Sequence, residues 1–158
     1  MRPSDDVATA GARQVALHNL HTGESISTVY WEDGAYVPGA LHEVNHVLRD
    51  FRTGDVHTIR PELMDLLHNL SRTLEVDRPF QVISGYRSPQ TNAMLREESN
   101  GVAQHSLHMQ GMAIDIRIEK VPLARLHKAA LILQRGGVGY YPDSDFVHVD
   151  IGPVRRWG

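Results

Sequence analysis

The sequence contains no cysteine among its 158 residues. Disulfide bonds and zinc sites built on thiolates are therefore excluded. No apolar run approaches the ~18 residues that a transmembrane helix needs. The first residues, Met1–Asp6, also lack the charged and then apolar pattern of a signal peptide. We expect a protein that does not span a membrane, and one that is either cytoplasmic or has lost a leader.

An excess of positive charge is missing as well. The 16 Lys and Arg residues are outnumbered by 19 Asp and Glu residues, which gives a formal net charge of -3. The chain therefore has no net electrostatic attraction to nucleic acid or to anionic lipid. We expect no nucleic-acid partner. The ten histidines raise the prior for a metal site only slightly, since most of them fall at scattered positions.

A chain of 158 residues fits one domain with a sizeable core. Residues 1–13 are small and polar without a hydrophobic period, so we predict a loose N-terminal arm followed by a single domain over residues 14–158. The segments 15–24 and 27–31 are rich in β-forming residues, and Asp33-Gly34 is a turn signal before Tyr36. These features predict an N-terminal β-meander.

Helical spacing follows the meander. Leu41, Val44 and Leu48 share one helix face. After Pro61, leucines recur at helical spacing from Leu63 to Leu74. Further helices are predicted from Ser88-Pro89 toward residue 98 and after Pro122. Between them lie predicted strands at 80–84, 113–118, 138–141 and 146–151. The sequence predicts an α+β fold in which a small antiparallel sheet is flanked by helices.

Two of these strands carry polar residues on one side. Ile114, Ile116 and Ile118 alternate with Asp115, and Val147 and Val149 alternate with His148 and Asp150. Each strand therefore buries an aliphatic face and directs imidazole or carboxylate groups to the other. Together with His108, two histidines and one aspartate form an open set of three ligands that suits a catalytic Zn²⁺.

This interpretation needs a bend in the chain. His108 and Asp115 would lie ~23 Å apart on an extended strand, and Gly111 stands where the chain can turn between them. The simpler alternative is a surface histidine beside an acid that closes a turn. For His148 and Asp150 the corresponding alternative is exposure on an edge strand.

The same residues resemble a known zinc peptidase superfamily. Ser106-x-His108-x-x-Gly111-x-Ala113-x-Asp115 matches the SxHxxGxAxD motif of the D-Ala-D-Ala metallopeptidases that cut bacterial cell-wall peptides, a superfamily that includes the hedgehog signalling domain. Segments 84–88 and 136–150 resemble its arginine turn and its last ligand strand. The similarity to the periplasmic murein endopeptidase branch extends over nearly the whole chain and implies a hedgehog-like fold.

The resemblance implies that His108, Asp115 and His148 bind Zn²⁺. A carboxylate must then take the proton of the attacking water. Asp150 shares the metal-facing side of its strand with His148, and strand parity favours it as this base. Many relatives carry a Glu three residues before the last histidine ligand, a place held here by Asp145, so Asp145 is the alternative base. Asp150 also has an alternative role, the orientation of a ligand or an arginine.

Arg87 lies in the predicted arginine turn, where its fixed charge would bind a peptide carboxylate or a developing oxyanion. His105 competes with His108 for the ligand role, but the register of the motif favours His108. Adjacent strand residues point opposite ways, so at most one of Tyr140 and Tyr141 lines the cleft. His42 and His46 are interpreted as a solvated helix face because no third ligand is near them in the sequence.

These features predict a zinc-dependent endopeptidase that hydrolyses peptide cross-links of bacterial peptidoglycan. Such an enzyme acts in the periplasm or elsewhere outside the cytoplasmic membrane, which implies that a leader has been removed. Two alternatives remain open, a non-catalytic, zinc-stabilised module that binds peptidoglycan and a D-Ala-D-Ala carboxypeptidase. Asp145, Asp150 and Arg87 argue against the first, while the sequence does not separate an exo-acting from an endo-acting cleft. The oligomeric state is not predicted.

Overall fold

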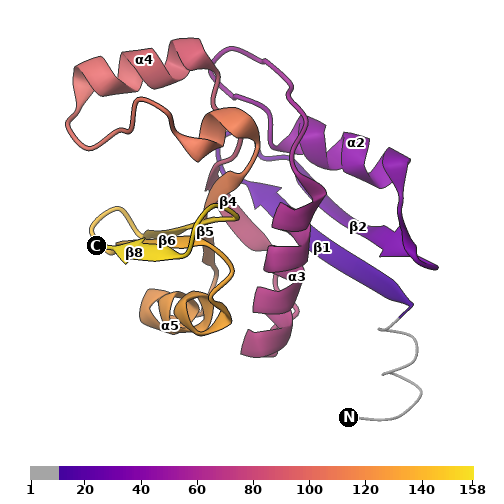
Figure 1. Ribbon diagram of the computed structural model, residues 1–158. Coiled ribbons are helices and arrows are strands. Elements are labelled where there is room, and N and C mark those ends of the chain that lie inside the picture. The colour runs from indigo at the N-terminus through magenta and orange to yellow at the C-terminus, as the bar shows by residue number, and fades with distance from the viewer. Residues whose placement is uncertain (1–10) are drawn as a thin grey trace.

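A computed structural model describes residues 11–158, whose strands form one sheet in the order β3-β2-β1-β4-β5-β7-β6-β8 (Figure 1). The strands are β1 (Ala12–Asn19), β2 (Ser25–Glu32), β3 (Ala35–Tyr36), β4 (Phe80–Ser84), β5 (Ala113–Ile118), β6 (Gly137–Tyr141), β7 (Phe146–Asp150) and β8 (Arg155–Trp157). The helices are α2 (Pro38–Val47), α3 (Pro61–Leu74), α4 (Pro89–Glu98), α5 (Leu123–Leu133) and a short 3₁₀ helix, η1 (Leu107–Gln110). No helix within residues 11–158 is long and apolar enough to cross a membrane.

The predicted α+β class is confirmed, but the sheet is larger than expected and is not purely antiparallel. β1 pairs in parallel with β4, and β6 pairs in parallel with β8. The first pairing arises because β2, β3, α2 and α3 all lie between β1 and β4 in the chain, which leaves ample length for a parallel crossover. The second involves β8, an edge strand of three residues that was not expected.

The N-terminal meander is confirmed. β1 pairs antiparallel with β2, and β2 pairs antiparallel with β3. Asp33 and Gly34 both take positive φ angles, 53° and 85°, as a tight hairpin turn requires. β1 begins at Ala12, inside the range for which a loose arm was predicted, and the rest of that arm, residues 1–10, lies outside the described residues.

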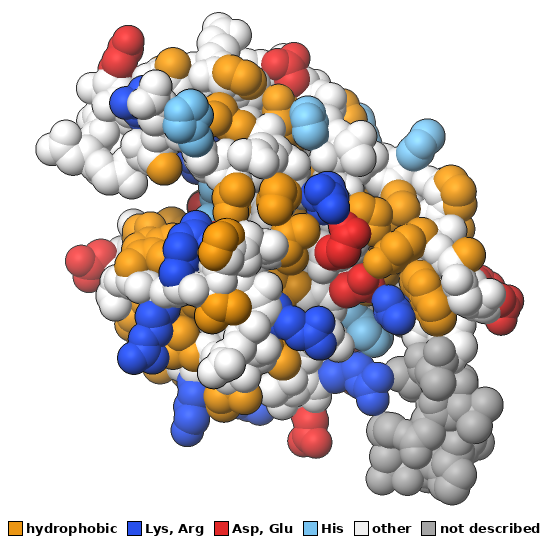
Figure 2. Space-filling model, viewed as in Figure 1, with side chains coloured by type: hydrophobic (Ala, Val, Ile, Leu, Met, Phe, Trp, Pro, Cys, Tyr) orange, Lys and Arg blue, Asp and Glu red, His pale blue; other side chains and the backbone are white. Residues whose placement is uncertain are grey.

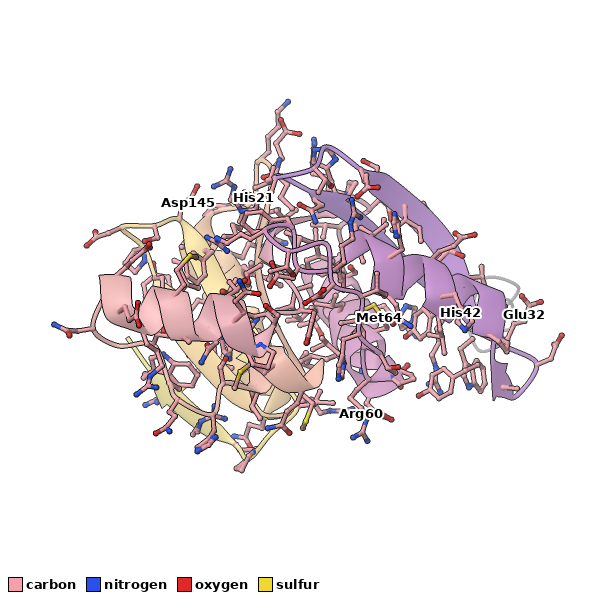
Figure 3. All side chains as sticks on the ribbon, turned by 90° about the horizontal axis from the view of Figure 1, so that it is seen from above. His21, Glu32, His42, Arg60, Met64 and Asp145 are labelled. Carbon is pink, nitrogen blue, oxygen red and sulfur yellow. The ribbon has the colours of Figure 1, made fainter. Side chains whose placement is uncertain are left out.

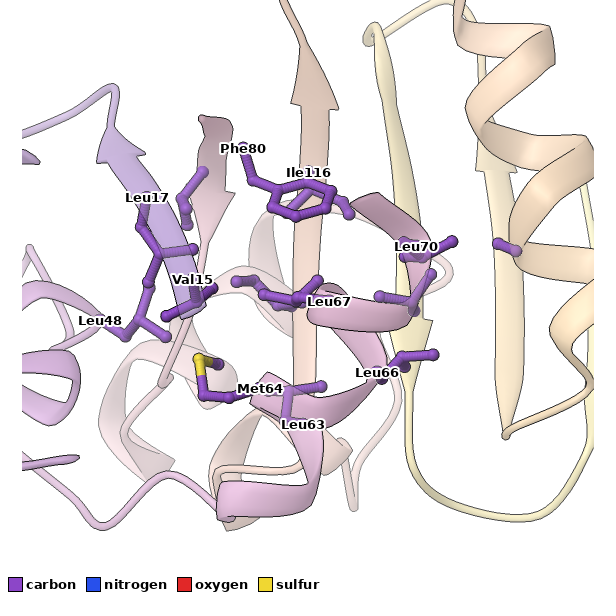
Figure 4. Packing of buried hydrophobic residues seen from close by; sticks show 14 of the residues in the cluster. Val15, Leu17, Leu48, Leu63, Met64, Leu66, Leu67, Leu70, Phe80 and Ile116 are labelled. Atoms are coloured by element: carbon purple, nitrogen blue, oxygen red, sulfur yellow. The ribbon is translucent and has the colours of Figure 1, made fainter. Parts of the chain in front are cut away.

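The hydrophobic core lies on one face of the sheet. Figure 4 shows the leucines of α3 directed at strand residues such as Leu17, Phe80 and Ile116, all of which are buried. α5 lies beside α3 and contacts β5, β6 and β7. Burying each such side chain contributes about 1.5–3 kcal/mol to folding. The opposite face of β5 to β8 is therefore left for polar side chains, and α4 and η1 lie over that face (Figure 1).

Candidate metal centre

η1 places His108 in the site. Its first turn is capped by Ser106, whose hydroxyl accepts a hydrogen bond from the His108 backbone N–H at 3.2 Å. Gly111 then ends the helix with φ 68°, and a Cβ there would come within 2.2 Å of the Thr58 carbonyl oxygen. The predicted bend is therefore at Gly111, where only glycine fits both the backbone and the space.

Asp115 and His148 face each other across two paired strands. They are direct partners in the antiparallel register of β5 and β7, and both side chains lie on the face away from the core. Asp115 Oδ1 is 3.2 Å from His108 Nε2 and 3.0 Å from His148 Nδ1. The structure thus brings the three predicted ligands together from η1, β5 and β7, and all three are buried.

The second nitrogen of each imidazole is occupied elsewhere. His108 Nδ1 lies 2.8 Å from the carbonyl oxygen of Gly85, and His148 Nε2 lies 2.7 Å from Asp150 Oδ2. Each of these nitrogens therefore carries a proton and donates it. In the neutral rings, His108 Nε2 and His148 Nδ1 are left with lone pairs that point at Asp115. Carbonyl or carboxylate partners of this kind fix ligating histidines in many zinc sites.

The donor set fits a zinc ion. The three ligand atoms lie within 4.8 Å of one another, and ligands of a tetrahedral zinc at about 2.0–2.2 Å lie about 3.3–3.6 Å apart. Burial alone would raise the pKa of Asp115. When protons on His108 Nε2 and His148 Nδ1 take the place of a cation, the attraction of His108 and the hydrogen bonds from both histidines outweigh burial and hold this pKa well below its usual value. A buried carboxylate facing two imidazole lone pairs is a site for a cation.

Asp150, the base that parity favoured, is fully buried with a relative exposure of 0%. Its Oδ1 accepts from the backbone N–H groups of Gly137 and Gly152, and its Oδ2 accepts from His148. Arg155 donates to both oxygens. Burial raises the pKa of Asp150, but these hydrogen bonds together lower it well below the ordinary value. This environment suits a carboxylate that orients His148.

Asp145, the alternative base, lies in the turn between β6 and β7 with φ 60°. Its side chain is 63% exposed, and its Oδ2 lies 3.4 Å from Arg117 Nη1. Arg117 lies two residues beyond Asp115 on β5, so both side chains are on the face of the sheet away from the core. Asp145, which contacts Arg117, therefore lies above the same face as the metal ligands. Figure 3 shows Asp145 and His42 far apart in the molecule.

Arg87 lies in the turn between β4 and α4, as predicted. Its Nη1 donates to Asn92 Oδ1 at 3.1 Å, whereas Nε is buried and has no partner among residues 11–158. Burial lowers the pKa of Arg87, and the charge of Asp115 opposes that shift. Arg87 also lines the cleft that holds the three ligands, and a guanidinium at such a place favours an anion or a carbonyl oxygen as its partner.

A cleft of about 610 Å³ is lined by the three ligands and by Arg87. Figure 2 shows the molecule hollowed between the part that carries α4 and the part that carries the C-terminal strands. Tyr141 lines the cleft, whereas Tyr140 stacks on His127 with ring centroids 4.2 Å apart. His105 also lines it, in addition to its neighbour His108. Asp145 and Asp150 are not among the lining residues.

Sequence reasoning missed the contribution of β8. Arg155 and Trp157 both line the cleft, and the Trp157 ring lies 5.1 Å from that of His148. Trp157 Nε1 donates to the Tyr141 hydroxyl at 2.7 Å. The signal that could have revealed this strand is the pair Gly137 and Gly139, which leaves β6 without a side chain on the metal-facing side until Tyr141.

His42 and His46 do not join the metal centre. They lie on α2, where His46 Nε2 is 3.4 Å from Glu24 Oε2. The only group of three or more potential ligands found in residues 11–158 consists of His108, Asp115 and His148. The histidine pair on α2 therefore supplies no second metal site in the described part of the chain.

Comparison with known proteins agrees with the sequence motif. A family model, Peptidase_M15_2, described as peptidoglycan L,D-endopeptidase MepK, matches residues 7–157. The chain is 46% identical over 151 residues to the peptidoglycan L,D-endopeptidase MepK of Escherichia coli K12, covering 96% of this chain and 83% of that one. It is 43% identical over 152 residues to the probable enzyme of that name from Haemophilus influenzae, covering 96% and 82%. The motif, the fold and these similarities together establish that the chain belongs to the Peptidase_M15_2 family of peptidases.

Proposed function

We propose that the chain is a zinc metallopeptidase that hydrolyses peptide cross-links of bacterial peptidoglycan. The observation that carries the proposal is the buried convergence of His108, Asp115 and His148 at the base of an open cleft. The relatives are named peptidoglycan L,D-endopeptidases. The bond cut by this chain is therefore proposed to join an L-configured and a D-configured centre within a cross-link.

The chemistry divides between the metal and the surrounding side chains. Zinc, when bound, supplies a Lewis acid and lowers the pKa of a coordinated water toward ~7. Asp115 would contribute the negative charge of the ligand set, and His108 and His148 would each hold the ion through the ring nitrogen that faces Asp115. Arg87 lines the same cleft as the three ligands, where its guanidinium would bind a substrate carboxylate or the oxyanion of the transition state.

Asp150 and Asp145 are proposed to have different roles. Asp150 is buried and accepts hydrogen bonds on both oxygens, so it holds the His148 ring and stays a carboxylate. Asp145 is exposed above the metal-facing side of the sheet, and its position matches the Glu of related enzymes. We assign the removal of the proton from the attacking water to Asp145. Before substrate binds, the hydrogen bond between a catalytic base and the group whose proton it takes is often long.

The two alternatives differ in what they predict. A D-Ala-D-Ala carboxypeptidase requires a free C-terminal carboxylate at Arg87, whereas an endopeptidase accepts a chain that continues past the scissile bond. A non-catalytic module would bind muropeptides without cutting them. The relatives, which are named L,D-endopeptidases, support the endopeptidase. Because peptidoglycan lies outside the cytoplasmic membrane, action in the periplasm or an equivalent compartment is part of the proposal.

The test is mass spectrometry of defined muropeptides after incubation with zinc-loaded and with chelator-treated protein. The substrates are a dimer joined by an L,D bond, a dimer joined by a D,D bond, and a monomer with a free D-Ala-D-Ala end. We expect zinc-dependent conversion of the L,D dimer to monomers. Release of D-Ala from the monomer alone would instead identify a carboxypeptidase, and binding without any cleavage would identify a binding module.

A further inference from the structure

The edge strand β8 reaches over its neighbour into the metal centre. β8 pairs in parallel with β6, which places Arg155 beside Gly137 and Trp157 beside Gly139. β6 in turn pairs with β7, where Gly139 is opposite His148. Asp115, His148, Gly139 and Trp157 therefore form one row across four strands, and Ala113, Asp150, Gly137 and Arg155 form the next row.

The two glycines leave the space that these contacts need. A Cβ on Gly137 would lie 2.5 Å from both Arg155 Nη1 and Asp150 Oδ2. A Cβ on Gly139 would lie 2.6 Å from the Trp157 ring. Any other residue would place a side chain where Arg155 and Trp157 cross β6. These glycines are therefore tied to the contacts that β8 makes with β7.

Arg155 holds Asp150 through a two-pronged contact. Its Nη1 donates to Oδ1 at 3.2 Å, and its Nη2 donates to Oδ2 at 3.1 Å. Oδ1 has two further donors, the backbone N–H groups of Gly137 and Gly152. Within residues 11–158, Oδ2 has only Arg155 and His148 as hydrogen-bond partners. Arg155 is thus the group that fixes the oxygen on which the His148 ring depends.

We propose that Arg155 is a positioning residue of the metal centre, acting on the ligand His148 through Asp150. The proposal rests on the zinc site of the proposed function. A planar guanidinium fixes the plane of the carboxylate, and the carboxylate fixes the tautomer and the orientation of the imidazole. Trp157 is the last residue of the row that contains His148. Its ring lies against the His148 ring, and its indole N–H donates a hydrogen bond to the Tyr141 hydroxyl.

The decisive measurement is zinc affinity, determined by competition with a chelator of known affinity. We expect Arg155→Met to weaken zinc binding about tenfold, in line with the loss of outer partners in other zinc sites. Arg155→Lys should recover part of that loss, because an ammonium group reaches one carboxylate oxygen and not both. Arg156→Met is the matched control, since this exposed neighbour on β8 makes no contact with Asp150, and we expect it to bind zinc as the wild type does.

Gly137→Ala tests the same contact while keeping the arginine, and so protects the test against a failure of Arg155→Met to fold. Its methyl group would come within 2.5 Å of both Arg155 Nη1 and Asp150 Oδ2 and so force the guanidinium and the carboxylate apart. We expect weaker zinc binding in the same chelator competition. A purely structural role of Arg155 would leave zinc affinity unchanged at a temperature where the variant is folded.

The proposal is overturned if folded Arg155→Met and Gly137→Ala both bind zinc within twofold of the wild type. Failure of the proposed function is a separate result, visible in the wild type as the absence of a zinc equivalent or of muropeptide cleavage. Wild-type protein that binds zinc and cleaves the dimer, beside an Arg155→Met variant of unchanged affinity, would reject the positioning role alone.

Discussion

Asp65 and Asp115 are two acidic side chains with aromatic partners, yet their partners differ in kind. Asp65, on α3, accepts hydrogen bonds from the hydroxyls of Tyr30 and Tyr36 at 2.7 and 2.6 Å and from Arg13 at 3.0 Å. Asp115 faces His108 and His148, whose remaining nitrogens already donate elsewhere. The first carboxylate is satisfied by donors from its own chain, and the second faces two lone pairs.

This difference separates a structural cluster from a metal site. Three donors around Asp65 tie α3 to β1, β2 and β3 and need nothing further. The Asp115 cluster becomes complete only when a cation lies between an anion and two imidazole nitrogens. Short distances are common to both clusters, so the positions of the protons decide which of them binds metal. The predictions below test this distinction.

The largest effect is expected from the removal of a ligand. His148→Ala should lose the zinc equivalent, and hydrolysis of the L,D dimer should fall by more than about 10³-fold because a metal ion contributes several kcal/mol to transition-state stabilisation. Elemental analysis and muropeptide turnover check this. Asp65→Asn is the control, expected to lower the melting temperature but to keep zinc and activity. A zinc-free Asp65→Asn protein would erase the contrast between the two clusters.

The two candidate bases should separate in their readouts. Asp145→Asn should keep zinc and lose about 10²- to 10⁴-fold in kcat, as expected for loss of a general base. Asp150→Asn should instead weaken zinc binding about 10- to 100-fold, because its role is to orient His148. His105→Gln is measured in the same two assays, because His105 also lines the cleft. If Asp150→Asn keeps full zinc affinity and loses turnover while Asp145→Asn stays active, Asp150 is the base.

Strand parity and a glycine bend indicated how the ligands could meet, and the resemblance to the peptidase superfamily supplied the ligand set. The alternation of Ile114 and Ile116 with Asp115 placed this aspartate on the face away from the core, and Gly111 marked the bend that returns His108 to it. These are local signals, because side-chain period and backbone conformation depend on neighbouring residues. The motif added the family, which the comparisons confirm.

The surroundings of Asp150 could not be predicted in the same way. Parity places the Asp150 side chain on the metal-facing side of β7. Its burial, however, depends on Arg155 of β8, which reaches Asp150 across β6. β8 has three residues, two of them arginines, and carries no periodic signal. Its position depends on space left by Gly137 and Gly139 in β6. Such long-range packing also explains why the mixed sheet was larger than predicted.

A smaller loss is expected at Arg87. Arg87→Lys keeps the positive charge but cannot reproduce a two-pronged contact, so turnover should fall about 10²-fold with zinc content unchanged. A fall in kcat would indicate contact with the oxyanion, whereas a rise in KM with kcat preserved would indicate a ground-state carboxylate. Wild-type kinetics for both Arg87→Lys and Arg87→Ala would show that the turn between β4 and α4 is only a scaffold.

The smallest effect on the reaction is expected at Asp50. Its carboxylate, like that of Asp65, is satisfied by hydrogen-bond donors of its own chain, so it tests whether such donors stabilise the fold. This residue is buried and accepts from the backbone N–H groups of Arg52, Thr53 and Ser88. Burial alone would raise the pKa of Asp50, but hydrogen bonds from the backbone of Ser88 and Arg52 and from the side chains of Thr91 and Ser88 outweigh it and lower the pKa to about 2. An unfolded Asp has a pKa of about 3.9.

Because the folded pKa lies below the unfolded one, the charged form of Asp50 stabilises the fold above about pH 5, and this contribution disappears as the pH falls toward 2. Asp50→Asn should lower the free energy of unfolding by about 2 to 3 kcal/mol at pH 7, and the gap to the wild type should narrow steadily below pH 4. Urea unfolding at several pH values measures it. The exposed Asp33→Asn is the control and should show no such narrowing. A gap that stays constant from pH 7 to pH 3 would show that the Asp50 carboxylate is not held by its charge, and that donors around a buried acid do not by themselves mark a stabilising cluster.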